Sequence, residues 1–435
     1  MNKNIKLAVA GAVLALSATA NAGIIIPAGD WTLDVNGNVN AFANYTKAKD
    51  SNAILGGHAV TRSAASVGQE DKYIGINTGL LPSWLGFTGT TRQNDVDVSF
   101  TISMQPNVSD NTLQGDNNAP LFRQSFLTFG DKSWGSVKLG KDIGVFASDA
   151  ILNDMTLLGV GAGAAGVYGN AGGSGAATTL GGIGTGYIYA AWKGQVAYTT
   201  PNFNGFQATA AITNPNQSAG TGNQDRYGFE AKASYSFAAN DVTGKVWVSG
   251  ATYDVSKATV AAQDAVCSSA DGTITAPSAA CGSSLITLSA YNAGTTAHSY
   301  RATMGDIGAN INFAGLGLTG YYYNAKGAGT TFMGNYGATA AGARRDSDGG
   351  YVQATYVLPT KTKLGFAYGI SSLDLAGGET NALLVKDNER YTVGAYHPLT
   401  KHLNLVAEYN SVQSKAQNGV KNDSDTYSAG AILFF

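Results

Sequence analysis

Apolar and polar residues alternate with a period of two along much of the chain. Between Trp31 and Tyr45 the apolar residues, among them Leu33, Val35 and Val39, fall on odd positions, whereas asparagines occupy the even positions 36, 38, 40 and 44. Successive side chains of a β-strand point to opposite faces, so this stretch predicts a strand with one apolar and one asparagine-rich face. An asparagine-lined face does not suit a protein core, and it indicates that this face meets water.

The stretch VAYTTPNFNGFQATAAI, residues 196–212, predicts a hairpin with the same two-faced strands. Val196 and Tyr198 alternate with small or polar residues before the turn, and the alternation resumes from Phe206. Pro201 cannot donate a hydrogen bond to a neighbouring strand, and Gly205 permits the chain to reverse. One hairpin does not decide whether its apolar face meets a protein core or lipid.

Further segments of this kind bring the number of expected strands to about sixteen. They lie near residues 31–45, 71–79, 95–105, 121–130, 135–141, 187–200, 206–214, 226–237, 244–255, 300–313, 316–325, 349–358, 362–372, 389–397, 403–412 and 425–435. Short turns alternate with long connections rich in Gly, Ser, Asn and Asp, as in transmembrane β-barrels with short periplasmic turns and longer outer loops. A secreted sandwich or solenoid is the rival all-β fold, but it does not require this alternation.

The amino-acid composition favours a membrane protein over a soluble one. Only 13% of the 435 residues are charged, against about 25% in ordinary soluble domains, while there are 57 glycines and 22 tyrosines. Beyond residue 22 there is no apolar run long enough for a spanning helix, and strands can span lipid only as a closed barrel. The net charge of −2 is too mild to suggest a nucleic-acid partner.

The N-terminus predicts export. Lys3 and Lys6 precede an apolar run over residues 7–16, and Ala20-Asn21-Ala22 is a small-residue cleavage site. The apolar run is shorter than the roughly 20 residues that a membrane-spanning helix needs. We therefore expect residues 1–22 to be a cleaved signal peptide and residues 23–435 to form the barrel.

The C-terminus and several internal motifs carry a family resemblance. The ending DTYSAGAILFF places Phe435 and alternate apolar residues on one face and resembles the last strand of outer-membrane barrels. With FRQSFLTFG (122–130), WGSVKLGKDIGV (134–145) and YHPLTKHLNLVAEY (396–409), it makes the chain resemble the Gram-negative general porins. The resemblance implies a homotrimeric, roughly sixteen-stranded outer-membrane diffusion pore for small hydrophilic solutes and ions. It also implies that Phe435 guides assembly by the barrel-assembly machinery.

In this family a long third loop folds into the lumen, where its acids face basic residues of the wall. The connection after Lys141 is unusually long for a structureless loop. By resemblance, Asp149 and Asp154 are the loop acids, and Arg123 and Lys138 are the wall bases. We expect Asp154 to lie opposite Arg123 as a hydrated carboxylate. The motif match places TLLGVG where the family has Pro-Glu-Phe-Gly, which weakens the expectation of a strong transverse field.

Cys267 and Cys281 lie in a long connection of an exported chain, and this context predicts a disulfide. No histidine lies near them in the spacing of a zinc site, and we expect neither a metal nor another cofactor.

Other functions remain open. A substrate-specific channel or an adhesion barrel is the stronger alternative. An outer-membrane hydrolase is weaker, because none of the four histidines lies in a recognisable Ser-His-acid signature. We therefore expect a protein that is not an enzyme.

Overall fold

A computed structural model describes residues 23–62, 71–106, 121–162, 178–215, 225–257, 265–268, 274–278, 286–289, 298–331 and 334–435. The predicted signal peptide lies outside these ranges. The strands of the main sheet are β1 (Ile24–Ala28), β2 (Trp31–Ala48), β3 (Lys72–Asn77), β4 (Trp84–Gln93), β5 (Val96–Gln105), β6 (Leu121–Asp131), β7 (Gly135–Ile143), β8 (Trp192–Thr199), β9 (Phe206–Thr213), β10 (Gly228–Ala239), β11 (Val242–Lys257), β15 (His298–Phe313), β16 (Leu316–Lys326), β17 (Asp346–Val357), β18 (Lys363–Leu373), β19 (Val385–Pro398), β20 (Leu403–Ala416) and β21 (Lys421–Phe434).

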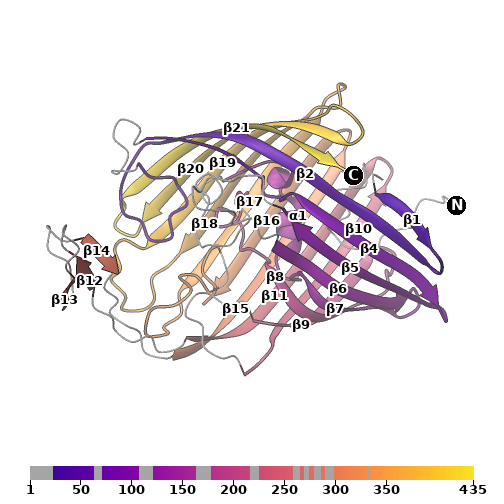
Figure 1. Cartoon of the computed structure of the whole chain (residues 1–435), viewed down its shortest axis with the longest axis horizontal. Helices are drawn as coiled ribbons and strands as arrows, with labels where there is room; N and C mark the ends of the chain where they lie inside the picture. Colours follow the sequence, from indigo (N-terminus) through magenta and orange to yellow (C-terminus); the bar gives the residue numbers. More distant parts are fainter. Residues whose placement is uncertain are drawn as a thin grey trace.

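These strands close into an antiparallel barrel of sixteen strand positions (Figure 1). β2 pairs with β21 over residues 38–48 and with β1 over residues 31–35, so β1 and β21 together fill one position. On its other side β2 pairs with β3 over residues 42–47 and with β4 over residues 32–38, so these two strands fill another. The closed sheet leaves no unpaired edge, as a barrel in lipid requires.

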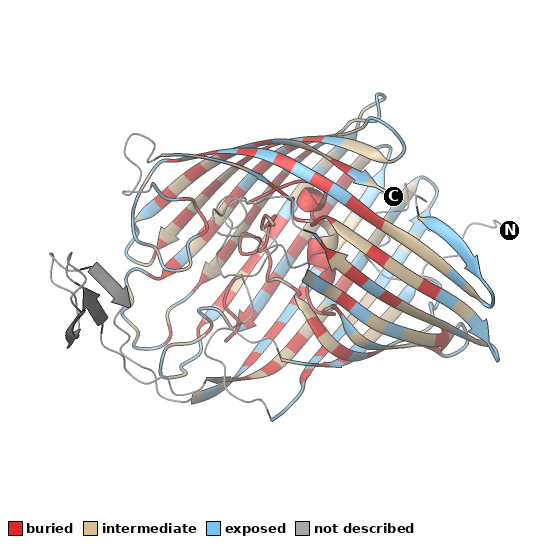
Figure 2. Cartoon of the chain, in the orientation of Figure 1, coloured by how far each residue is buried: buried red, intermediate tan, exposed pale blue. Residues whose placement is uncertain are grey.

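Burial alternates along the strands as the period-two pattern predicts (Figure 2). In β19 the buried residues include Arg390, Thr392 and Tyr396, whereas Tyr391 and Val393 between them are 46% and 53% exposed. The polar and mixed face therefore points into the barrel, and the apolar face covers the outside. This exposed apolar surface suits lipid rather than water.

The sequence-based strand assignment is confirmed in number and, with small shifts at the ends, in most bounds. Two strands of the main sheet, β1 and β4, were not expected. The expected strand at 71–79 corresponds to β3, which fills only part of the strand position that it shares with β4. In β4 the alternation is hidden by two glycines. A Cβ on Gly86 would lie 2.5 Å from the ring of Trp84, and one on Gly89 would lie 2.2 Å from that of Phe100, so both glycines leave space for rings.

The turn at 201–205 is a hairpin turn as predicted, between β8 and β9. The Gly205 amide donates to the Asn202 side chain at 2.6 Å, and Asn204 and Gly205 both have positive φ, at 53° and 102°. At the end of β21, Gly37 and Phe435 exchange backbone hydrogen bonds of 2.8 and 3.1 Å. The last residue thus takes part in closing the barrel, while its role in assembly stays a prediction.

A separate three-stranded sheet is formed by β12 (Ala265–Ser268), β13 (Ile274–Ser278) and β14 (Ile286–Ser289). Figure 1 shows it beyond the end of the barrel that lies opposite the two termini. Cys267 lies in β12, but Cys281 falls outside the described residues, so the disulfide stays a prediction. In the described part of the chain no helix is long and apolar enough to cross a membrane.

Candidate functional site

The third long connection joins β7 to β8 and folds into the barrel, where Figure 1 shows its short helix α1 (Ser148–Asn153). A 3-10 helix, η2 (Met155–Leu158), follows directly. We call the described parts of this connection the third loop; residues 144–162 are its outgoing limb and residues 178–191 its returning limb. A helix as short as α1 is not stable alone, so its stability depends on the side-chain contacts that the third loop makes with the barrel wall.

Asp149 of α1 is paired with two lysines of the wall. Its carboxylate lies 2.8 Å from the Lys232 ammonium of β10 and also contacts the Lys245 ammonium of β11. The Asp149 side chain is only 3% exposed, so both lysines are needed to offset the cost of burying its charge. Asp149 therefore docks the start of the third loop on β10 and β11.

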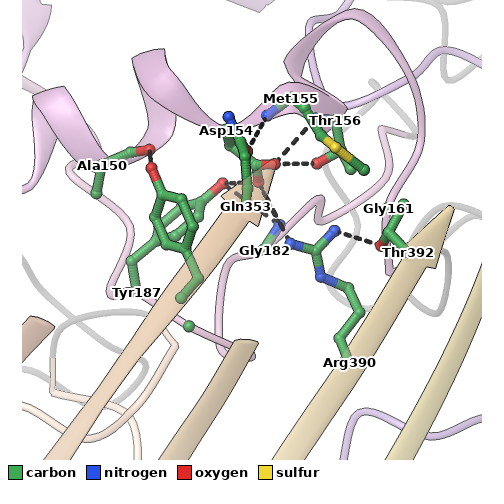
Figure 3. A network of polar contacts seen from close by, with 12 residues as sticks. Ala150, Asp154, Met155, Thr156, Gly161, Gly182, Tyr187, Gln353, Arg390 and Thr392 are labelled. Atoms are coloured by element: carbon green, nitrogen blue, oxygen red, sulfur yellow. Dashed lines mark hydrogen bonds and ion pairs between the residues drawn. The ribbon is translucent and has the colours of Figure 1, made fainter. Parts of the chain in front are cut away.

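Asp154 is the centre of a second polar network (Figure 3). One carboxylate oxygen accepts hydrogen bonds from the Thr156 amide at 2.9 Å and hydroxyl at 2.7 Å, which caps η2. The other accepts from the Gly182 amide at 3.0 Å and the Tyr187 hydroxyl at 2.8 Å, and lies 3.7 Å from the Arg390 guanidinium of β19. Asp154 thus joins the outgoing limb of the third loop to its returning limb and to the wall.

The pairing that we expected between Asp154 and Arg123 is wrong. Asp154 is 4% exposed and its ion-pair partner is Arg390. Arg123, on β6, instead donates to the Tyr189 hydroxyl at 3.5 Å where the third loop returns to the wall. The two acids and the two bases were assigned from local motifs, and motifs carry no information about which of sixteen strands a loop approaches.

Lys138 lies on β7, on the opposite face from Leu139, which is 36% exposed on the outside. Its ammonium pairs with Asp142 and lies 4.8 Å from the centre of the Phe126 ring. Gln124 donates to the same carboxylate at 3.1 Å. Lys138 therefore lies on the inner face of the barrel and forms its ion pair with Asp142, not with Asp149 or Asp154.

Glu408 of β20 holds residues 159–161 at the end of the outgoing limb, which we call the tip of the third loop, and was not foreseen. Its carboxylate accepts hydrogen bonds from the amides of Val160 and Gly161 at 2.9 and 2.8 Å, and the Tyr396 hydroxyl donates to it at 2.6 Å. Successive amides around one carboxylate form an anion-binding nest. The only signal in the sequence was an acid at an inward position of a strand, which does not reveal a loop amide as partner.

A ring of tyrosines supports the loop between these polar anchors. Tyr187 lies edge-on to Tyr321 and Tyr351 of the wall, with ring centres 6.5 and 5.8 Å apart, and all three rings are buried. The Tyr351 hydroxyl also donates to the Ala150 carbonyl at 2.8 Å. These contacts place the third loop against β16 and β17 as a packed element of the lumen.

A barrel with a loop inserted in its lumen has the architecture of a channel, and the comparison of the chain with protein families agrees with this. A family model described as Gram-negative porin matches residues 7–417. The chain belongs to the Gram-negative porin family. No curated protein matches it in sequence.

Solved structures show the same fold for this porin at low sequence identity. The outer membrane channel DcaP of Acinetobacter baumannii aligns with a TM-score of 0.62 and 14% identity, over 94% of this chain and 99% of that one. An anion-selective porin from Comamonas acidovorans gives 0.57 and 15%, over 93% and 100%. Salmonella typhi OmpF in complex with daunomycin gives 0.53 and 12%, over 95% and 100%.

The connection between β2 and β3, which we call the first long connection and which is described over residues 49–62, also contacts the third loop of the porin. The His58 amide donates to the Ser414 hydroxyl at 2.8 Å, and the ring Nε2 lies 2.8 Å from the Thr331 hydroxyl. A Cβ on Gly184 would lie 2.4 Å from the His58 ring, so the ring rests on the returning limb. Burial lowers the pKa of His58 to about 4, and the neutral imidazole is the form that fits this site.

Proposed function

We propose that this porin is a weakly selective pore for passive diffusion of small hydrophilic solutes, with the third loop as its narrow section. Its family and fold are those of outer-membrane diffusion channels. The observation that supports the narrow section is the third loop, which is anchored inside the barrel by four buried carboxylates, those of Asp149, Asp154, Glu230 and Glu408. A loop held this firmly within a lumen narrows it permanently.

The charge balance supports weak ion selectivity. Each of the acids Asp149 and Asp154 has a basic partner on the wall, and Lys138 has Asp142. Arg123 forms no ion pair with any described residue. We propose that Arg123 and Lys138 line the narrow section, Arg123 beside the point where the third loop returns to the wall, and that Arg123 gives a slight preference for anions. The acids of the third loop then shape the pore more than they select ions.

The chain is proposed to act as a homotrimer in the outer membrane, after export by the signal peptide and assembly guided by Phe435. Membership of the porin family supports this proposal, and one of the similar solved structures is described as a trimer form. A disulfide between Cys267 and Cys281 belongs to the same proposal, because exported proteins meet oxidising conditions.

Vesicles that contain the purified porin test the diffusion function. Their swelling rate in isotonic sugar solutions should fall steadily from a monosaccharide to a trisaccharide. When one sugar replaces an impermeant solute at constant osmolarity, the rate should rise in proportion to the sugar concentration. Control vesicles without protein should not swell. Uptake that saturates with one sugar and excludes others of equal size would favour a substrate-specific channel, and a lack of uptake would favour an adhesion barrel.

A further inference from the structure

The barrel wall is interrupted between β3 and β4. Both strands pair with β2, β3 with residues 42–47 and β4 with residues 32–38, and the chain between them leaves the wall. We call residues 78–83 the inward bend. Thr78, Gly79, Leu80, Pro82 and Ser83 are all buried, so the bend lies inside the barrel rather than in lipid.

Two asparagines of β2 satisfy the backbone of the inward bend. Asn40 accepts a hydrogen bond from the Gly79 amide at 2.9 Å and donates to the Leu81 carbonyl at 2.9 Å, while Asn38 donates to the Pro82 carbonyl at 3.2 Å. Both asparagines are at most 1% exposed. Buried backbone groups need such partners. The asparagine-rich face of β2, expected to meet water, is here occupied by the bend.

The inward bend reaches the tip of the third loop. The Leu80 amide donates to the Gly159 carbonyl at 2.9 Å, and a Cβ on Gly79 would lie 2.1 Å from the same oxygen. The Leu80 side chain rests on Gly181 of the returning limb, where a Cβ would lie 2.2 Å from Leu80 Cδ2. The bend therefore contacts both limbs of the loop at one point.

Glu408 holds the same tip. A Cβ on Gly159 would lie 1.9 Å from its carboxylate, which also accepts the two amides that follow. Gly159 thus lies in contact with Glu408 of the wall and with the inward bend. A loop tip held by both cannot swing aside without breaking one of these contacts.

We propose that the inward bend is a second constriction element, which fixes the tip of the third loop and so sets the size limit of the pore. This inference rests on the proposed diffusion function. It assigns a specificity-determining role to Gly79 and Leu80, and a positioning role to Asn38, Asn40 and Glu408. If the inward bend served only to close the wall, substitutions in it would change the stability of the barrel but not the size limit of the pore.

The substitution Gly79→Ala tests this proposal with a single methyl group. The backbone of Gly79 does not have a positive φ, so the penalty for alanine arises from contacts of its Cβ, at 2.1 Å with the Gly159 carbonyl oxygen and at 2.8 Å with the Phe42 ring. The closer contact, with the backbone of Gly159, forces the bend and the tip apart. Gly320→Ala is a matched control, because a Cβ at that position on β16 meets open space. Both proteins are reconstituted in planar bilayers and in vesicles.

Gly79→Ala should increase the open-channel current noise and raise the ratio of trisaccharide to monosaccharide uptake, whereas Gly320→Ala should match the wild type. Leu80→Ala, which removes the side chain that rests on Gly181, should act in the same direction and serves if Gly79→Ala fails to fold. Uptake ratios and noise that equal those of the control in whichever variants fold would overturn the proposal. A wild-type protein that transports no sugar would instead refute the proposed function.

Discussion

Asp154→Asn is expected to loosen the third loop, because the asparagine cannot reproduce the network around the carboxylate. One oxygen of Asp154 accepts two hydrogen bonds from Thr156, and the other accepts from Gly182 and Tyr187 beside Arg390. An asparagine has one acceptor oxygen and one NH₂ group. Whichever way it is turned, a donor faces donors on one side, and Arg390 loses its counter-charge in a buried site.

The expected size of the effect follows from these losses. Breaking a buried ion pair by removing one partner costs about 3–5 kcal/mol. We take the lower value of about 3 kcal/mol, because the ion-pair distance of 3.7 Å is long. Since about 1.4 kcal/mol corresponds to a factor of ten, the population of the released loop should rise roughly 100-fold. The barrel itself should stay folded, because its wall hydrogen bonds do not involve Asp154.

Limited proteolysis and single-channel recording measure this release. Asp154→Asn should be cut faster within the third loop and should show more frequent current fluctuations, with an unchanged β-sheet circular dichroism spectrum. Asp95→Asn is the control, since it removes one carboxylate in an exposed turn whose φ of 63° suits asparagine. Equal cleavage rates and equal current noise in the two variants would refute the anchoring role of Asp154.

Three further predictions concern ions, pH and assembly. Arg123→Gln should shift the reversal potential in a salt gradient toward cations, an effect that shrinks with salt because the Debye length is about 10 Å at 0.1 M; no shift relative to Lys132→Gln at low salt would exclude Arg123 from the pore lining. Docking of the first long connection should weaken as the pH falls from about 6.5 to about 4. The pKa of His58 is lowered to about 4 in the docked state, so over this range the undocked state binds the proton more readily and is favoured. Proteolysis of residues 49–62 should therefore accelerate over that range in the wild type but not in His58→Gln, and parallel pH profiles would contradict this. Phe435→Ala should reduce the amount of inserted porin more than it alters the conductance of inserted channels, and normal insertion would remove the assembly role of the last residue.

The fold was predictable because its determinants are local. The alternation of Tyr391 and Val393 with the inward Arg390 and Thr392 can be recognised in a few residues, and so can the turn at 201–205. β4 was not recognised because its glycines make room for neighbouring rings instead of adding to the apolar face. Local alternation therefore fixes the number and the faces of the strands.

The partners of the loop acids could not be predicted in this way. Asp149 and Asp154 were placed correctly in the inserted loop, but their contacts depend on the tilt and closure of the whole barrel. Lys245 is 96 residues from Asp149. Glu408 is 248 residues from the Val160 amide that it binds. No local spacing of residues encodes contacts between residues so far apart in the sequence. The inward bend, which contacts the asparagines of β2, could not be predicted for the same reason.

Single-channel conductance as a function of salt concentration tests the central claim most directly. A water-filled pore with a permanently anchored third loop should give a conductance that rises nearly in proportion to salt, without saturation, together with a small reversal potential in a salt gradient that indicates a slight preference for anions. Small currents that saturate with salt or with one solute, or a barrel that carries no current after insertion, would contradict the account.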